Sequence, residues 1–213
     1  MSILRTLLAS LLLLLAGGAV LSAATDRFQA FTTEAARRVE VRRQPVDIPS
    51  VGLQLQSGAR IDFADLRGKW LLVEFIYTRC PTYCLALGGE FAQLQDRLAG
   101  PIADGKVQLL SISFDPGHDT PQQLAAYLQR SGDRDIGSNR AGAPGWLAGR
   151  PEEPGDLERL ERAFGITVVP DALGGYTHNA AIHLVGPRGR LVEIYDLGDP
   201  GAVGRAVLRG LAR

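Results

Sequence analysis

The run from Trp70 to Tyr77 (WLLVEFIY) restricts the fold more than any other part of the sequence. It is rich in apolar and β-prone residues, and polar turns bound it on both sides, which is typical of a central strand buried on both faces of a sheet. After Pro81, apolar residues recur every three or four positions and predict a helix whose first turn tolerates the proline. These apolar residues are Leu87, Phe91, Leu94 and Leu98. The pattern therefore predicts a strand, a short turn and a helix in succession, with Cys80 at the carboxyl end of the strand.

From residue 46 onward, predicted strands alternate with predicted helices. The strands are 51–56 and 61–63, which form a hairpin, followed by 107–114, 146–148, 180–185 and 191–195. One helix begins after the capping box at Thr120, and two more cover about 157–164 and 203–211. Most of 131–154 is predicted to be loop. This order, which ends in an antiparallel hairpin and a helix, predicts an α/β fold. We expect a thioredoxin-like sandwich, with a central mixed sheet flanked by helices and an N-terminal hairpin.

The first 24 residues have the composition of an export segment. Arg5 is the only charged residue before Asp26, and residues 11–15 are an unbroken run of leucine. The small residues at 22–24 suit cleavage by a signal peptidase, yet about 20 uncharged residues also suffice to span a bilayer. The sequence leaves both alternatives open, so we expect 1–24 to be an export signal or a membrane anchor. Residues 25–45 read as a partly helical spacer, and 46–213 as the folded domain.

The overall balance of charge excludes one class of ligand. Lysine and arginine together number 23, as do aspartate and glutamate, in a chain of 213 residues. Because no positive charge is in excess, nucleic acid is not expected as a partner. The length suits one domain with a short appendage.

Cys80 and Cys84 are the only cysteines, and their spacing places them on one face of the first helical turn. The helix N-terminus favours the thiolate, which both nucleophilic attack and soft-metal binding require. In an exported protein the pair could also form a disulfide, although so short a loop would gain little stability from it. The three intervening residues argue weakly against a dithiol oxidoreductase of the usual kind, which has two.

Three separate motifs in this chain resemble those of one known family. They are FIYTRCPTYC at 75–84, DPGHDTP at 115–121 and THNAAIHL at 177–184. In this order and spacing they look like the SCO/SenC family of thioredoxin-fold, copper-binding proteins that assist cytochrome c oxidase assembly, with a likeness that spans about 46–195. The resemblance implies that Cys80, Cys84 and His178 bind copper, with the histidine at the start of the penultimate strand. The local sequence predicts that His178 stands in a loop just before that strand. Two thiolates and an imidazole suit Cu(I) better than a hard cation or zinc.

The chain departs from the family pattern at Thr82, where Asp is common, and at Leu85, where Pro is common. These two departures affect the fine tuning of the site or the choice of partner more than the set of metal ligands, because neither side chain is a ligand in the family that the chain resembles. Of the other histidines, His183 is expected to pack within its strand and His118 to lie in a solvated turn. Asp115 and Asp119 flank that turn, and turn formation and helix capping explain both, with a supporting role near the cysteines as a secondary hypothesis.

The leading functional hypothesis is an exported copper metallochaperone, on the periplasmic side of the membrane, that passes Cu(I) to the copper-receiving subunit of cytochrome c oxidase. Met1 is the only methionine, so a separate copper donor is expected. The alternative is a thiol-disulfide oxidoreductase that keeps the cysteines of that subunit reduced, with Cys80 as the more exposed nucleophile and a separate thiol reductant as its partner. A peroxiredoxin-like peroxidase is disfavoured because it needs Thr or Ser where Tyr77 stands and Pro where Val73 stands.

Overall fold

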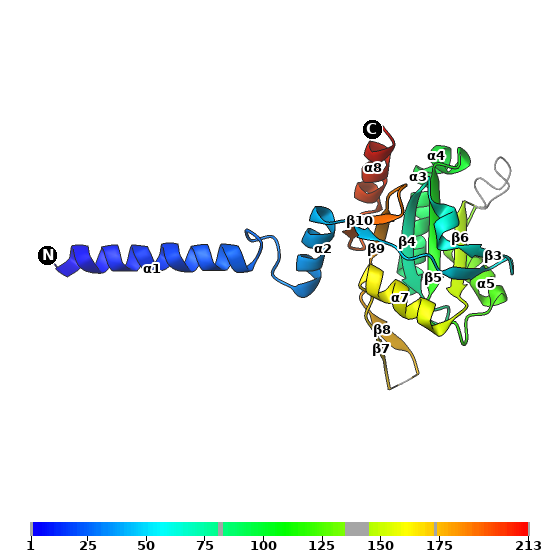
Figure 1. Ribbon diagram of the computed structural model, residues 1–213, viewed down its shortest axis with the longest axis horizontal. Coiled ribbons are helices and arrows are strands. Elements are labelled where there is room, and N and C mark those ends of the chain that lie inside the picture. Colours follow the sequence, from blue (N-terminus) through cyan, green and yellow to red (C-terminus); the bar gives the residue numbers. More distant parts are fainter. Residues whose placement is uncertain (1, 81–82, 135–144, 173, 213) are drawn as a thin grey trace. The chain divides into compact units, whose positions relative to one another are not determined.

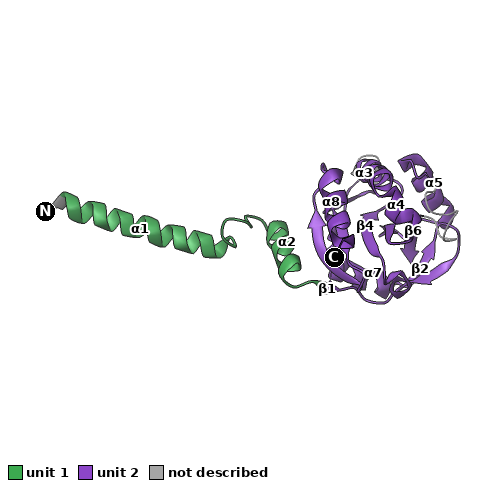
Figure 2. Ribbon diagram, turned by 90° about the horizontal axis from the view of Figure 1, so that it is seen from above, with its two compact units in different colours: residues 1–45 green, residues 46–213 purple. Residues whose placement is uncertain are grey.

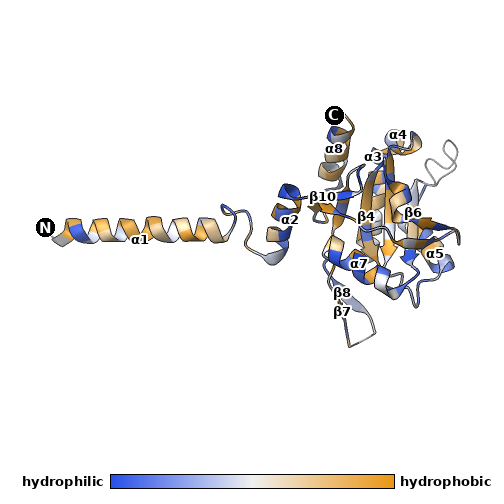
Figure 3. Ribbon diagram, in the orientation of Figure 1, coloured by the Kyte–Doolittle hydropathy of each residue, from blue (hydrophilic) through white to orange (hydrophobic). Residues whose placement is uncertain are grey.

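The computed structural model describes residues 2–80, 83–134, 145–172 and 174–212, and the side chains of 2, 83–85 and 154 lie outside that description. The described chain divides into two compact units, residues 1–45 and 46–213 (Figure 2). Unit 1 contains α1 (Ser2–Ala24) and α2 (Thr33–Arg43). α1 is apolar along its length whereas α2 is largely hydrophilic (Figure 3). Within the described residues, α1 is the one helix long and apolar enough to cross a membrane, by length and composition.

Unit 2 is built on an eight-stranded mixed sheet in the order β1-β10-β9-β4-β5-β6-β2-β3 (Figure 1). Its strands are β1 (Val46–Asp47), β2 (Gly52–Leu55), β3 (Arg60–Asp62), β4 (Trp70–Ile76), β5 (Val107–Ser113), β6 (Trp146–Pro151), β9 (Ile182–Val185) and β10 (Arg190–Tyr195). β4, β5 and β6 run parallel, and the remaining pairs are antiparallel. β4 lies in the interior of the sheet between β9 and β5. The predicted N-terminal hairpin, central strand and C-terminal hairpin are confirmed.

Helices cover both faces of this sheet. They are η1 (Phe63–Leu66), α3 (Tyr83–Arg97), α4 (Ala99–Ala103), α5 (Pro121–Ser131), α7 (Pro154–Phe164) and α8 (Pro200–Leu211). Trp70 of β4 meets Gly210 of α8, whereas Phe75 packs on Phe164 of α7. Because side chains alternate along a strand, α8 and α7 lie on opposite faces. α3 contacts both α8 and α5, so these three helices share one face. The predicted α/β sandwich, with a mixed sheet between helices, is confirmed.

The structure differs from the sequence prediction between α7 and β9. Two short strands, β7 (Val168–Pro170) and β8 (Tyr176–His178), form a separate antiparallel hairpin that extends from the body of unit 2 (Figure 1). The prediction that His178 stands in a loop was wrong, because it is the last residue of β8. The predicted strand at 146–148 is longer than expected and runs to Pro151 as part of the main sheet. Residues 135–144 of the predicted loop lie outside the described residues.

Candidate metal site

Cys80 lies at the end of a tight turn that follows β4. Its backbone N–H donates to the carbonyl of Tyr77 at 3.2 Å, and its side chain is only 9% exposed. The prediction that Cys80 is the more exposed of the two cysteines stays a prediction, because it requires the side chain of Cys84 for comparison. Helix α3 begins at Tyr83, so the backbone of Cys84 lies in its first turn, as predicted. The side chain of Cys84 lies outside the described residues, as do Thr82 and the side chain of Leu85, and for these the predictions stay predictions.

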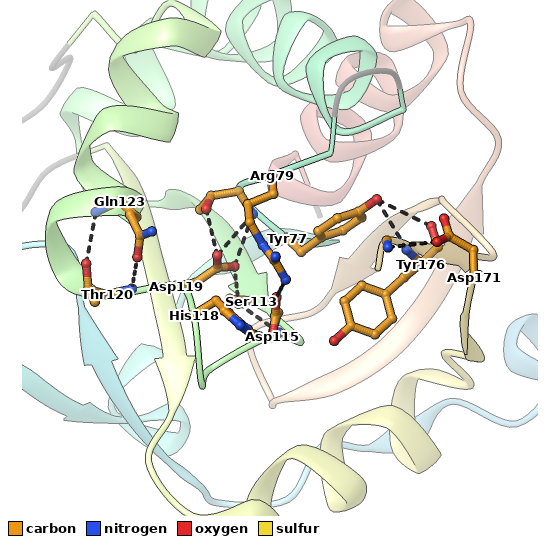
Figure 4. Close-up of polar contacts among 12 residues, drawn as sticks. Tyr77, Arg79, Ser113, Asp115, His118, Asp119, Thr120, Gln123, Asp171 and Tyr176 are labelled. Atoms are coloured by element: carbon orange, nitrogen blue, oxygen red, sulfur yellow. Dashed lines mark hydrogen bonds and ion pairs between the residues drawn. The ribbon is translucent and has the colours of Figure 1, made fainter. Parts of the chain in front are cut away.

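The turn that carries Cys80 is held by the buried carboxylate of Asp119 (Figure 4). This carboxylate accepts hydrogen bonds from the backbone N–H of Thr78 at 3.1 Å, from the Thr78 hydroxyl at 2.6 Å and from the hydroxyl of Ser113 at 2.6 Å. The expected capping role does not belong to Asp119, because Thr120 is the N-cap of α5, in a capping box with Gln123. Asp119 instead connects the end of β5 to the segment two residues before Cys80.

An ion pair holds Arg79, the residue between Thr78 and Cys80 in the same turn. The guanidinium of Arg79 donates to Asp115 at 2.7 Å, and Nδ1 of His118 lies 2.8 Å from the other oxygen of that carboxylate. Burial alone would raise the pKa of Asp115, but the hydrogen bonds from His118 and Arg79 outweigh it and hold this pKa below its usual range. His118 is exposed, as expected for a turn residue.

His178 has a fixed backbone and an imidazole that makes no hydrogen bond within the described part of the chain. Its backbone pairs with Val168 across the β7–β8 hairpin, and the next residue, Asn179, bonds to the backbone of Gly165 and Thr167 just after α7. Both ring nitrogens are buried without a hydrogen-bond partner among the described residues. Burial lowers the pKa of His178, so the ring is neutral at pH 7 with a lone pair that a metal ion could use.

Aromatic side chains connect His178 to the Cys80 turn. The ring of Phe114 lies 5.0 Å from the His178 ring, 5.4 Å from that of Tyr77 and 5.6 Å from that of Tyr176. Tyr77 and Tyr176 also meet edge to face, at 5.2 Å, and Figure 4 shows the Tyr77 hydroxyl directed at the backbone of Tyr176. We call Tyr77, Phe114 and Tyr176 the aromatic wall. Through it, the predicted ligand on β8 and the turn before Cys80 belong to one packed unit.

Sequence reasoning missed the aromatic wall, and it gave Asp119 a role near the cysteines only as a secondary hypothesis. The one available signal was the DPGHDTP motif after a buried strand, because Phe114 directly precedes this motif and Asp119 lies within it. His183 packs in the core as expected, with Phe164 5.3 Å away and Nδ1 3.3 Å from the Val73 carbonyl. Among the side chains that the structure describes, which exclude that of Cys84, no three His, Cys, Asp or Glu lie close enough together to hold a metal ion.

Comparison with known proteins gives consistent matches. The SCO1/SenC family model matches residues 50–213. A provisionally named copper-binding protein of Stutzerimonas stutzeri is 34% identical over 195 residues, which are 90% of this chain and 88% of that protein. The SCO1 protein homolog of Bacillus subtilis is 28% identical over 67% of this chain and 70% of its own length. The structure of Bradyrhizobium japonicum ScoI with copper bound aligns with a TM-score of 0.60 and 27% identity, over 77% of this chain and 98% of that chain.

Proposed function

Because the chain belongs to the SCO1/SenC family, we propose that it binds Cu(I) through Cys80, Cys84 and His178 and helps to metallate the copper site of cytochrome c oxidase. Two thiolates and an imidazole form a soft ligand set that suits Cu(I). Zinc would more often take a fourth protein ligand or a water molecule. The proposed partners are the copper-receiving subunit of the oxidase and a separate copper donor or thiol reductant.

The observation that carries the proposal is the imidazole of His178. Buried polar atoms in proteins nearly always have a hydrogen-bond partner, and those that lack one call for a specific explanation. Both ring nitrogens of His178 are buried and lack such a partner within the described residues. A bound metal ion would satisfy one of them, and the chemistry of the residue fits that role.

Loading with copper requires both cysteines as thiolates. A disulfide of a partner could oxidise the Cys80 and Cys84 thiols by thiol-disulfide exchange, in which it takes up their two electrons and two protons as its own two thiols; the resulting Cys80–Cys84 disulfide would lack both thiolate ligands and would not bind Cu(I). The thiol-disulfide oxidoreductase remains the second candidate. The three residues between Cys80 and Cys84 count against it, because a dithiol oxidoreductase of the usual kind has two.

For the N-terminal part we propose export to the periplasmic side of the membrane. Residues 1–24 would act as the export signal or the anchor and 25–45 as a spacer, with 46–213 as the copper-binding domain. The support is α1, whose length and composition suit a bilayer span.

The test is an anaerobic Cu(I) titration of the reduced full chain in detergent, against a competing chelator, for the wild type, His178→Ala and Leu208→Ala. We expect one Cu(I) per chain, and for His178→Ala an affinity lower by more than tenfold, because even outer partners of a ligand cost about 10–100-fold when removed. Leu208→Ala is the control and should bind like the wild type, because Leu208 is 46% exposed on α8, the helix that meets Trp70 at the start of β4. Equal affinities for the wild type and His178→Ala would contradict the ligand assignment.

A further inference from the structure

The backbone of His178 is fixed by hydrogen bonds, whereas its ring is not. Pairing with Val168 fixes the residue itself, and the Asn179 side chain fixes the peptide that follows. A histidine that binds a metal usually donates a hydrogen bond from its other ring nitrogen, which sets the tautomer and the ring orientation. Neither ring nitrogen of His178 makes such a bond within the described part of the chain. Another contact must therefore orient the ring.

Phe114 makes that contact. Its ring centroid lies 5.0 Å from the imidazole centroid, with the two planes inclined by 59°. Aromatic pairs at this separation stabilise one relative orientation beyond the area that they bury. In the described structure, Phe114 is the aromatic residue whose ring contacts His178.

Phe114 is itself held in place from two directions. Its backbone N–H donates to the carbonyl of Ile76 at 3.0 Å, which connects it to the end of β4. Its side chain is 5% exposed and packs against both Tyr77 and Tyr176. The ring therefore has a fixed position relative to both the Cys80 turn and the β8 strand that carries His178.

We infer that Phe114 is the positioning residue for His178, and that it orients the metal-binding imidazole by ring packing where other metal sites use a hydrogen bond. The inference rests on the proposed copper site. It also implies that His178 can leave the metal without the loss of a hydrogen bond at its second nitrogen, which suits a protein that must release its copper.

The chain offers a matched control for this inference. Phe164 also packs on a histidine, with ring centroids 5.3 Å apart, but that partner is the core residue His183. The substitutions Phe114→Leu and Phe164→Leu thus remove the same ring from the same kind of contact, in one case at the proposed site and in the other within the core. Phe114→Tyr keeps the ring and tests for rescue.

The experiment measures the Cu(I) affinity of the reduced full chain and the rate of copper loss to a chelator, for these three variants, His178→Ala and the wild type. We expect Phe114→Leu to lower the affinity on the order of tenfold and to speed copper loss. Phe114→Tyr and Phe164→Leu should stay near the wild type. An unchanged affinity for Phe114→Leu, or equal losses for Phe114→Leu and Phe164→Leu, would overturn the inference. If His178→Ala instead bound Cu(I) as tightly as the wild type, the result would contradict the assignment of His178 as a copper ligand.

A second measurement covers the case in which Phe114→Leu does not fold. In the wild type, proton NMR contacts between the rings of Phe114 and His178 should be present without metal and should persist after Cu(I) is bound. Loss of these contacts on binding would show that Phe114 does not set the bound orientation, and would overturn the inference.

Discussion

At the scale of single residues, Glu74 is the most unusual group in the core. It lies within β4, six residues before Cys80, and is fully buried. One of its oxygens accepts hydrogen bonds from Ser111 at 2.5 Å and from Tyr127 at 2.9 Å, and the indole of Trp146 donates to that serine hydroxyl. Burial is the largest influence, and despite these bonds it raises the pKa of Glu74 to about 8 from an ordinary value of 4.5.

This raised pKa makes stability depend on pH. Between pH 4.5 and 8 the folded chain keeps the Glu74 proton that the unfolded chain has lost, so the free energy of unfolding falls as pH rises through this window. Glu74→Gln removes the titration. We expect its free energy of unfolding, relative to the wild type, to rise between pH 5 and 8 by on the order of 4 kcal/mol.

Urea unfolding at several pH values checks this prediction. Glu153→Gln, at an exposed position, serves as the control and should follow the wild type. Parallel pH profiles for Glu74→Gln and the wild type would mean that Glu74 ionises in the folded protein much as it does in the unfolded one.

At the scale of elements, α3 contains two adjacent glycines, Gly88 and Gly89. The close approach of α3 to α5 explains why glycine is needed at the first of them. A Cβ added at Gly88 would lie against the Ser131 side chain, 2.7 Å from its Cβ, and 3.1 Å from the Tyr127 hydroxyl. A Cβ at Gly89 would meet nothing within 4 Å. Close packing against α5 therefore accounts for Gly88 alone.

The two glycines therefore give opposite predictions for the same substitution. Gly89→Ala should stabilise the protein by about 0.5–1 kcal/mol, because alanine is the better helix former. Gly88→Ala should destabilise it by about 1–3 kcal/mol through overpacking, and Ser131→Gly in the same chain should restore part of the loss. Thermal unfolding measures all three, and equal effects at the two positions would contradict the helix crossing.

Some elements of the fold could be predicted from the sequence, and others could not. Long buried strands such as Trp70–Ile76, and helices with clear caps such as Pro121–Ser131, have local patterns that predict them. The β7–β8 hairpin has strands of three residues, one of which ends in Pro170, so neither shows a usable alternation. The contact of Phe114 with His178 depends on where that hairpin packs, which no local pattern encodes. The proposed metal ligands could be inferred from the sequence only through motifs in register.

At the scale of the whole molecule, the proposed function assigns different roles to the domain at 46–213 and to the apolar α1. In that proposal the cysteines of the domain must be reduced to bind copper. α1 has the length and composition to cross a bilayer. An arginine at the centre of a bilayer-crossing helix costs about 2.5–3.5 kcal/mol on insertion scales. Leu13 lies in the middle of α1, within the compact unit 1–45 and outside the one that carries the cysteines.

We accordingly expect Leu13→Arg to impair export. In a bacterial host whose outer membrane has been opened, added protease should reach the domain of the wild-type chain and should reach less of the Leu13→Arg domain. Leu13→Ile is the matched control and should behave like the wild type. Protection of the wild-type domain from protease would contradict export.

X-ray absorption spectroscopy of the Cu(I)-loaded, reduced full chain tests the central claim most directly. The proposed site predicts a three-coordinate copper with two sulfur ligands and one imidazole, and loss of the imidazole scattering in His178→Ala. Two sulfur ligands without an imidazole in the wild type, or an imidazole signal that survives in His178→Ala, would contradict a site made of Cys80, Cys84 and His178.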